Sequence, residues 1–144
     1  MLLKFHRSFQ MKITTFCIIL LFTCSNNYGQ NLIGYKNDEI KKFMKENHKD
    51  MNYNKVRNSL FSYLKYSDNS DNQTILFFLT PDSVCKSIQL ICNSTLKNDK
   101  IKELDANYRK LGDYSWLDDR NGNKYLITLK DEKWSCSITI KPDK

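Results

Sequence analysis

The chain has 144 residues, of which 40% are hydrophobic, and its 23 basic and 16 acidic residues give a formal net charge of +7. This length fits one domain with a single modest core. Lysine greatly outnumbers arginine and alternates with acidic residues. Nucleic-acid-binding proteins gather arginine, lysine and aromatic residues on one face, so we expect no nucleic-acid partner.

The first 29 residues follow the charged, apolar and polar order of a signal peptide. Basic residues come first, at Lys4, Arg7 and Lys12. The apolar run at 13–23 has eleven residues, whereas a membrane-spanning helix needs ~20. We therefore expect residues 1–29 to be removed. Residues 30–144 are then a single secreted or periplasmic domain, with no transmembrane helix in the mature form.

The start and the cleavage position of this signal each have an alternative. Translation from Met1 or from Met11 leaves an acceptable signal. Gly29 is small and favours cleavage directly after it. Cleavage before Cys24 is the alternative, because residues 21–24 loosely resemble the Leu-small-small-Cys pattern of bacterial lipoproteins. Lipidation at Cys24 would make the chain an anchored envelope lipoprotein with a structural role.

The mature part begins with a predicted helix at about 38–50, in which Ile40, Phe43 and Met44 recur at helical spacing. Residues 52–62 are ambiguous, because their apolar residues also fit a helical face. Runs of alternating or β-prone residues then predict three strands, at 63–67, 74–80 and 84–93.

A second helix is predicted at about 95–111. It is followed by three predicted strands, at 114–118, 124–130 and 134–141. Asn121 and Gly122 between the first two indicate a tight hairpin, because both tolerate positive φ. In the last strand one face is predicted to carry Trp134, Cys136, Ile138 and Ile140.

A helix followed by three strands thus occurs twice, at about 37–93 and 94–142. A shift of fifty residues superposes the strand blocks, for example Leu76 on Leu126. We predict an α+β fold in which two αβββ repeats form an antiparallel sheet of about six strands, with two helices packed on one face. Common ancestry of the two units stays open, because any two amphipathic units of this kind share apolar positions.

In element order, size and export, residues 37–141 resemble the tandem αβββ arrangement of exported bacterial PepSY-like and β-lactamase-inhibitor-protein-like domains. In those families, two small repeats build one antiparallel sheet with the helices on one face. The acidic-glycine-aromatic turns often found in such repeats are missing, and the nearest stretches are 118–123 and 131–134. The resemblance implies binding or inhibition and transfers no functional residues.

Cysteine and histidine usage bears on disulfides and metals. Three cysteines follow the signal: Cys85, Cys92 and Cys136. Cys92 and Cys136 are predicted to lie on the inner face of equivalent strands in the two repeats, so they are the disulfide candidates. The alternative is that they pack in the core as thiols. With His48 as the one histidine of this part and no CxxC motif, we expect no metal site and no cofactor. The acidic loops at 68–72 and 118–123 lack the late glutamate of a calcium loop.

The chain contains no Gly-x-Ser-x-Gly, glycine-rich phosphate loop or HExxH motif, so we expect no enzymatic activity. The rival hypothesis is a small secreted hydrolase or thiol enzyme that uses Cys85 or His48. A nucleophilic cysteine would need a nearby base, and none is visible from the sequence.

Aromatic residues are frequent in the predicted strands, and apolar residues are predicted on both faces of the sheet. One face would carry Phe77, Leu90 and Ile127, and the other would carry Leu76, Phe78, Ile91 and Leu126. Such a sheet either covers its second face, here with residues 52–62, or offers it to a partner. We therefore predict an exported, non-enzymatic and inhibitor-like module for an unknown protein partner. The candidate binding residues are Trp116, Phe78 and Tyr66.

Overall fold

The structure is a computed structural model that describes residues 31–55, 62–120 and 122–143. The predicted signal peptide, with its alternative starts and cleavage positions and Cys24, lies outside the described residues. The same holds for residues 56–61 of the ambiguous segment and for Asn121 of the predicted hairpin.

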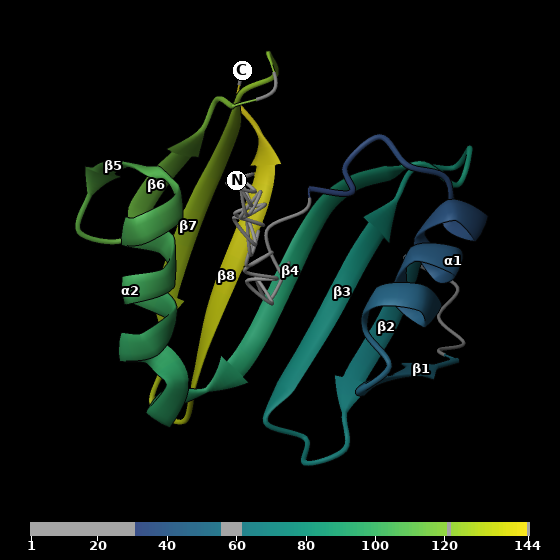
Figure 1. The fold of residues 1–144 in the computed structure, drawn as a ribbon, viewed down its shortest axis with the longest axis horizontal. Coiled ribbons are helices and arrows are strands. Elements are labelled where there is room, and N and C mark those ends of the chain that lie inside the picture. Colours follow the sequence, from purple (N-terminus) through teal and green to yellow (C-terminus); the bar gives the residue numbers. More distant parts are fainter. Residues whose placement is uncertain (1–30, 56–61, 121, 144) are drawn as a thin grey trace, which may run out of the picture. The chain divides into compact units, whose positions relative to one another are not determined.

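Within these residues the chain forms two α-helices, a short 3-10 helix and eight strands. The first half contains α1 (Asn37–Asn47), β1 (Met51–Asn54), β2 (Tyr63–Asp68), β3 (Gln73–Leu79) and β4 (Cys85–Asn93). The second half contains η1 (Ser94–Leu96), α2 (Lys97–Asn107), β5 (Arg109–Gly112), β6 (Ser115–Asp118), β7 (Tyr125–Asp131) and β8 (Ser135–Pro142). The strands form one antiparallel sheet in the order β1-β2-β3-β4-β8-β7-β6-β5 (Figure 1). The fold is α+β and mostly sheet.

The first four strands meet the last four where β4 pairs with β8, a junction that we call the seam. Its register runs from Ile88 opposite Ile140 to Asn93 opposite Ser135. Each group of four strands follows one α-helix in the chain. The seam therefore joins segments that are far apart in the sequence.

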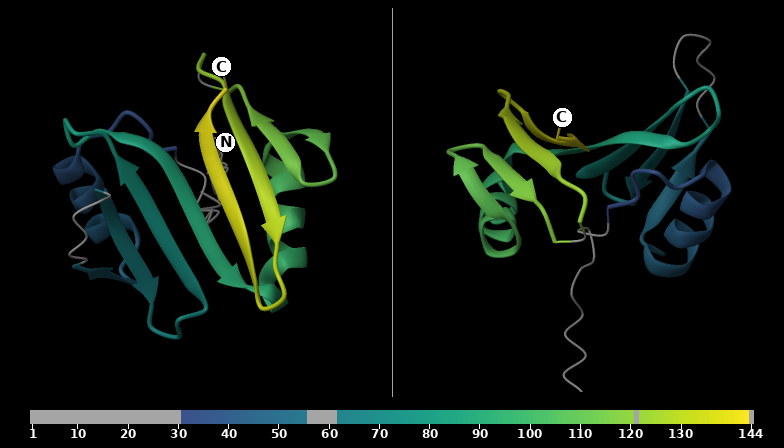
Figure 2. Two further views of the ribbon diagram at one scale, coloured as in Figure 1. Left: turned by 180° about the vertical axis from the view of Figure 1, so that it is seen from behind. Right: turned by 90° about the horizontal axis from the view of Figure 1, so that it is seen from above.

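Both α-helices lie on the same side of the sheet, α1 over the end that carries β1 and α2 over the end that carries β5 (Figures 1 and 2). α1 buries Ile40 and Met44, and α2 buries Leu104. The first turn of α1 is capped because the Glu39 carboxylate accepts a 2.7 Å hydrogen bond from the backbone N–H of Lys36. The helices thus cover the inner face of the sheet.

Side chains alternate between the two faces of each strand. In β3, Ile75, Phe77 and Leu79 are buried, and Leu76 and Phe78 between them are half-buried. The cluster under α2 is formed by Cys92, Leu104, Trp116, Ile127, Leu129, Cys136 and Ile138. The core therefore lies between the sheet and the helices, and the opposite parity predicted for neighbouring apolar residues is confirmed along β3.

The prediction of about six strands was wrong, because the sequence did not reveal two short edge strands. β1 begins just before the ambiguous segment, where Met51 pairs with Asp68 and is 7% exposed. β5 occupies the end of the helix predicted at 95–111. α2 ends at Asn107, and the extended residue after it leads into β5, where Lys110 pairs with Trp116. Pairing with β6 outweighs the helical spacing there.

The predicted position of Trp134 was also wrong. Trp134 precedes β8 in the β7–β8 hairpin, which is closed by a 2.9 Å bond from the N–H of Glu132 to the carbonyl of Ser135. Its side chain is 77% exposed, and the Lys133 ammonium lies 5.1 Å from the ring centroid. Cys136 and Ile138 are buried, as their parity predicted.

Candidate binding face

The sheet face opposite the helices is the candidate functional surface, and we call it the outer face. The view from behind shows the strands in front of both helices (Figure 2). Along each strand its side chains alternate with those of the core. The edge strands contribute Asn52, Asn54 and Arg109, and the six strands between them contribute Tyr63, Lys65, Ser67, Thr74, Leu76, Phe78, Ser87, Gln89, Ile91, Ser115, Leu117, Leu126, Thr128, Lys130, Ser137, Thr139 and Lys141. No helix of the described residues covers this face.

Apolar side chains on the outer face gather in two places. Near β2 and β3, Phe78 pairs with Tyr63 in register, and their ring centroids are 5.9 Å apart. Both rings are half-buried, as is Leu76 on the same strand as Phe78. Across the seam, Leu126 is half-buried and pairs with Leu117, which is 5% exposed and therefore buried. The face thus presents aromatic surface near β2 and β3, and Leu126 contributes the smaller aliphatic surface across the seam.

Hydroxyl and amide side chains occupy the centre of the outer face. One row continues from Leu76 through Gln89 of β4, Thr139 of β8 and Thr128 of β7 to Ser115 of β6. This row is uncharged. Charged residues are depleted at the centre of protein interfaces, and this row shares that property.

The lysines of the outer face lie toward its margins. Lys65 of β2 lies beyond Leu76, outside the uncharged row, and Lys130 and Lys141 lie near the two ends of the β7–β8 pair. A polar chain on the β1–β3 side is internally bonded, since Ser67 Oγ lies 3.1 Å from Thr74 Oγ1 and accepts from Asn54 Nδ2 at 3.0 Å. The arrangement is a neutral centre bordered by cations.

Two of the three predicted binding residues belong to the core, which corrects that prediction. Trp116 is 0% exposed, and its indole N–H donates a 2.8 Å hydrogen bond to Asp105. Tyr66 is 4% exposed and meets Phe77 edge-on at 6.0 Å between centroids, and burial raises the pKa of Tyr66 to about 12. Phe78 alone of the three lies on the outer face.

Cys85 and His48, the residues of the rival enzyme hypothesis, are both buried. Cys85 is 2% exposed, and burial raises its pKa to about 11. A nucleophilic cysteine needs a depressed pKa and access to substrate, so this environment disfavours that role. His48 ends α1 beside Phe43, and burial lowers its pKa, opposed in part by the charge of Asp50.

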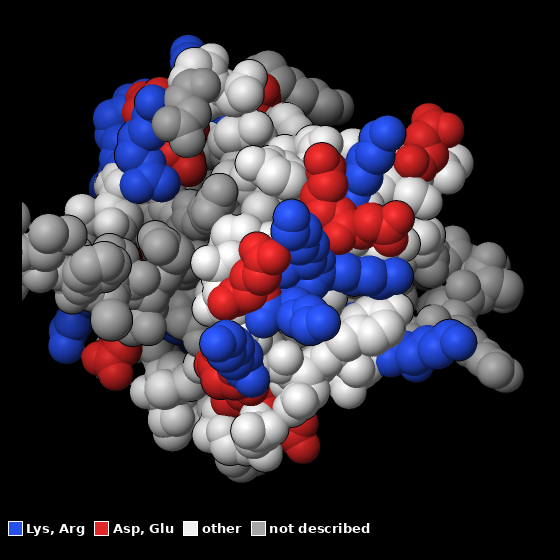
Figure 3. Space-filling view, turned by 45° about the vertical axis from the view of Figure 1, so that its right-hand side comes forward, with Lys and Arg blue, Asp and Glu red and all other residues white. Residues whose placement is uncertain are grey.

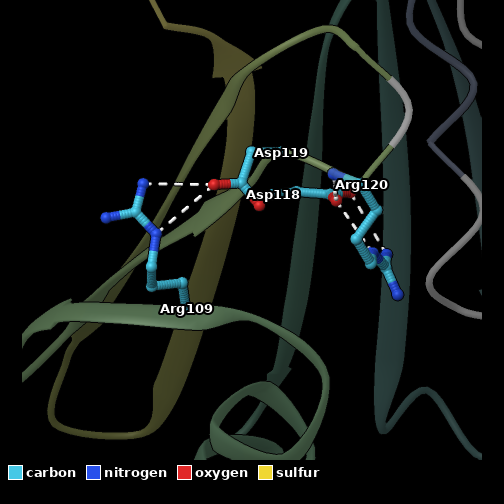
Figure 4. Close-up of polar contacts among 4 residues, drawn as sticks. All are labelled: Arg109, Asp118, Asp119 and Arg120. Carbon is cyan, nitrogen blue, oxygen red and sulfur yellow. Dashed lines mark hydrogen bonds and ion pairs between the residues drawn. The ribbon is translucent and has the colours of Figure 1, made fainter.

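A cluster of four charged residues lies at the β5–β6 end of the sheet (Figure 4). Arg109 and Asp119 pair at 3.1 Å, and Arg120 pairs with Asp118 at 2.9 Å. The Asp118 carboxylate is buried, and the bond to it raises the pKa of Arg120, which also stacks over the Tyr108 ring at 4.6 Å. Each arginine therefore has its own acidic partner, and the cluster serves the fold.

The exposed surface of α1 carries lysines that line an open depression with one acidic residue: Lys41, Lys42, Lys45, Glu46 and Lys49. Blue and red side chains are interleaved on this side of the molecule (Figure 3). The mixture indicates a solvated helix face of both signs rather than an anion-binding patch.

Among the described residues, no group of three or more histidine, cysteine, aspartate or glutamate side chains could hold a metal ion. The acidic turn after β2 is bonded internally, because Asp68 accepts from the N–H of Gln73 at 3.1 Å and from Ser70 Oγ at 2.9 Å. Neither described helix is long and apolar enough to cross a membrane.

Comparison of the chain with models of protein families, with curated proteins and with solved structures gave no match in any of the three. A proposal for the function therefore rests on the side chains of the outer face. The apolar residues of this face could be predicted from the alternation of side chains along each strand. The row of hydroxyl and amide side chains across four strands could not, because it depends on how the strands pair.

Proposed function

We propose that this chain is an exported, non-enzymatic binding module that engages another protein through the outer face. The observation that supports it is the uncharged, partly apolar centre of a broad sheet face that no described helix covers. Export is the expectation from the first 29 residues, and it places the partner in the envelope or the medium.

A protein is the partner class that fits this chemistry best. The outer face is a sheet surface with a hydroxyl row, and Phe78 and Leu76 offer partly exposed apolar area for a hot spot. Aromatic residues are enriched, and charged residues depleted, at the centre of protein interfaces. The buried, high-pKa Cys85 and the buried His48 weigh against the enzyme hypothesis.

We also propose that the two halves are structural repeats, at about 37–93 and 94–142, with the helices packed on one face. The mirrored strand order on either side of the seam supports this, as does a helix at the start of each half. Each unit then has four strands rather than three. We propose on this basis that the chain is similar in organisation to PepSY-like and inhibitor-like tandem domains, which bind other proteins.

Two surface variants test the proposed face in a matched way. Phe78→Glu places a negative charge at the aromatic side of the outer face, and Lys42→Glu places a negative charge on α1. The mature chain and both variants are used to capture partners from envelope and medium of the source cells. We expect one partner retained by wild type and Lys42→Glu, and lost with Phe78→Glu, which still unfolds cooperatively, with a melting temperature lowered by several degrees because its side chain is half-buried.

The enzyme hypothesis is tested on the same preparations. If no protein is enriched over the control, and a panel of substrates is turned over by wild type but not by Cys85→Ala or His48→Ala, the binding proposal is overturned. A partner lost equally with both surface variants would place the contact elsewhere.

A further inference from the structure

Cys92 and Cys136 face each other across the seam. They are directly opposite in the β4–β8 register, on the inner face of the sheet. Their side chains are 2% and 0% exposed, and their sulfur atoms are 2.7 Å apart. Two thiols from distant parts of the chain are thus in contact where the two halves of the sheet join.

The backbone at this position already suits a covalent link. Opposite residues in antiparallel strands have Cα atoms about 4.5–5.5 Å apart. Disulfides span Cα separations of about 4.4–6.8 Å, so β4 and β8 would not have to move apart or together.

Cys85 is excluded as the partner by its position. It lies at the opposite end of β4 from Cys92, seven residues or roughly 23 Å away along an extended strand. Its register partner is Leu79 of β3, and its thiol donates to the carbonyl of Ser87 at 3.6 Å. The three cysteines that follow the predicted signal therefore divide into one pair and one single thiol.

We propose that Cys92 and Cys136 form a disulfide that fastens the seam between the two halves of the sheet, and that Cys85 remains a thiol. This proposal does not rest on the proposed function, because the two cysteines lie on the inner face of the sheet. The oxidant is a disulfide of the glutathione class. The Cys92 thiolate attacks oxidised glutathione and releases one glutathione thiolate, and the Cys136 thiolate then attacks the Cys92 sulfur and releases the second. The two protein protons pass to the glutathione thiolates, so one S–S bond is broken and one is made.

Burial determines when this bond can form. Desolvation and the neighbouring Cys136 thiol raise the pKa of Cys92 to about 12, which leaves little thiolate in the folded chain. Exchange requires the thiolate and access to the oxidant. The bond therefore forms during folding, before β4 and β8 close, and resists added reductant afterwards.

The test is a peptide map of residues 30–144, refolded with oxidised and reduced glutathione, then alkylated in denaturant without reductant and digested with trypsin. Cleavage after Lys65, Lys86, Lys97 and Lys133 separates the three cysteines onto peptides 66–86, 87–97 and 134–144. We expect 87–97 joined to 134–144, and 66–86 carrying the alkyl group.

Matched variants complete the design. Cys85→Ala should keep the link, and Cys136→Ala should leave 87–97 alkylated. We further expect the linked chain to melt roughly 10 °C above the reduced chain, because the bond closes a long loop. Alkylation of all three peptides in the wild type, or a link that includes 66–86, would overturn the pair. Equal melting temperatures with the link present would overturn its role in fastening the seam.

Discussion

Single residues in β3 show how alternation assigns neighbouring side chains to different tasks. Phe77 is 2% exposed and meets Tyr66 edge-on in the core, whereas Phe78 is half-buried on the outer face. The same side-chain chemistry therefore contributes core stability at one position and contact surface at the next. Substitutions at such positions separate stability from binding.

Trp116→Ala should lower the free energy of unfolding by ~3–5 kcal/mol, because it leaves a large cavity and removes a bond to Asp105. Phe78→Ala is the control and should cost under about 2 kcal/mol, since its ring is already partly in solvent. Urea denaturation of both variants measures the difference. Equal losses would contradict the assignment of the two rings to opposite faces.

His48 should make the free energy of unfolding fall as the pH drops below the ordinary pKa of histidine. Burial lowers its pKa from 6.5 in the folded chain. The unfolded chain therefore binds a proton first, so the full stability is present above pH 6.5 and is lost as the pH falls through the lowered folded pKa. Urea midpoints between pH 7.5 and about 5 should decline in wild type and decline less in His48→Gln. Parallel pH curves for the two proteins would refute this role.

At the scale of elements, the two edge strands are short and polar. β1 and β5 have four residues each, and β5 carries Arg109 and Lys110, which are paired with Asp119 and Asp105. Short edge strands discourage pairing with other chains, and the charges of β5 add to this effect at that edge. The outer face can therefore be exposed while the edges of the sheet do not pair with strands of other chains.

The β6–β7 turn depends on Gly122, which has a φ of +77°. A Cβ at this position would meet nothing within 4 Å, so only the backbone conformation opposes a side chain. Gly122→Ala should lower the free energy of unfolding by about 1–2 kcal/mol, and Gly122→Asn by less, because asparagine tolerates this region better. Thermal unfolding of the two variants checks the order, and an unchanged Gly122→Ala would contradict it.

Six strands and two helices could be predicted from the sequence because their signals are local. β8 alternates strictly from Cys136 to Ile140, and β3 and β7 are bounded by turn residues. The missed strands depend on non-local pairing: Lys110 lies in β5 because Trp116 is its neighbour across the turn. Trp116 and Tyr66 were mistaken for surface residues because parity reveals that two faces exist and does not say which one the helices cover.

For the whole molecule, the asymmetry between the two sheet faces is the main feature. The inner face is covered and holds Trp116 and the Cys92–Cys136 contact, while the outer face is left to its own side chains. A single sheet of eight strands with helices on one side leaves a broad second face. The proposed function is the use of that face.

The fate of the N-terminus is a separate prediction at this scale. We expect the exported chain to begin at Gln30, because Gly29 completes the signal pattern. Intact-mass measurement of protein from the medium or periplasm decides this. A mass that still includes Met1 or Met11 would contradict cleavage, and a chain that begins at acylated Cys24 would establish the lipoprotein alternative.

Site-specific photo-crosslinking tests the central claim, that the outer face binds a protein, most directly. A benzophenone amino acid replaces Phe78 in one protein and Lys42 in another, and each is irradiated in the envelope or medium of the source cells. The account predicts a discrete protein adduct from position 78 and none from position 42, because the first lies on the outer face and the second on the helix side. Adducts from position 42 alone, or from neither position, would contradict it.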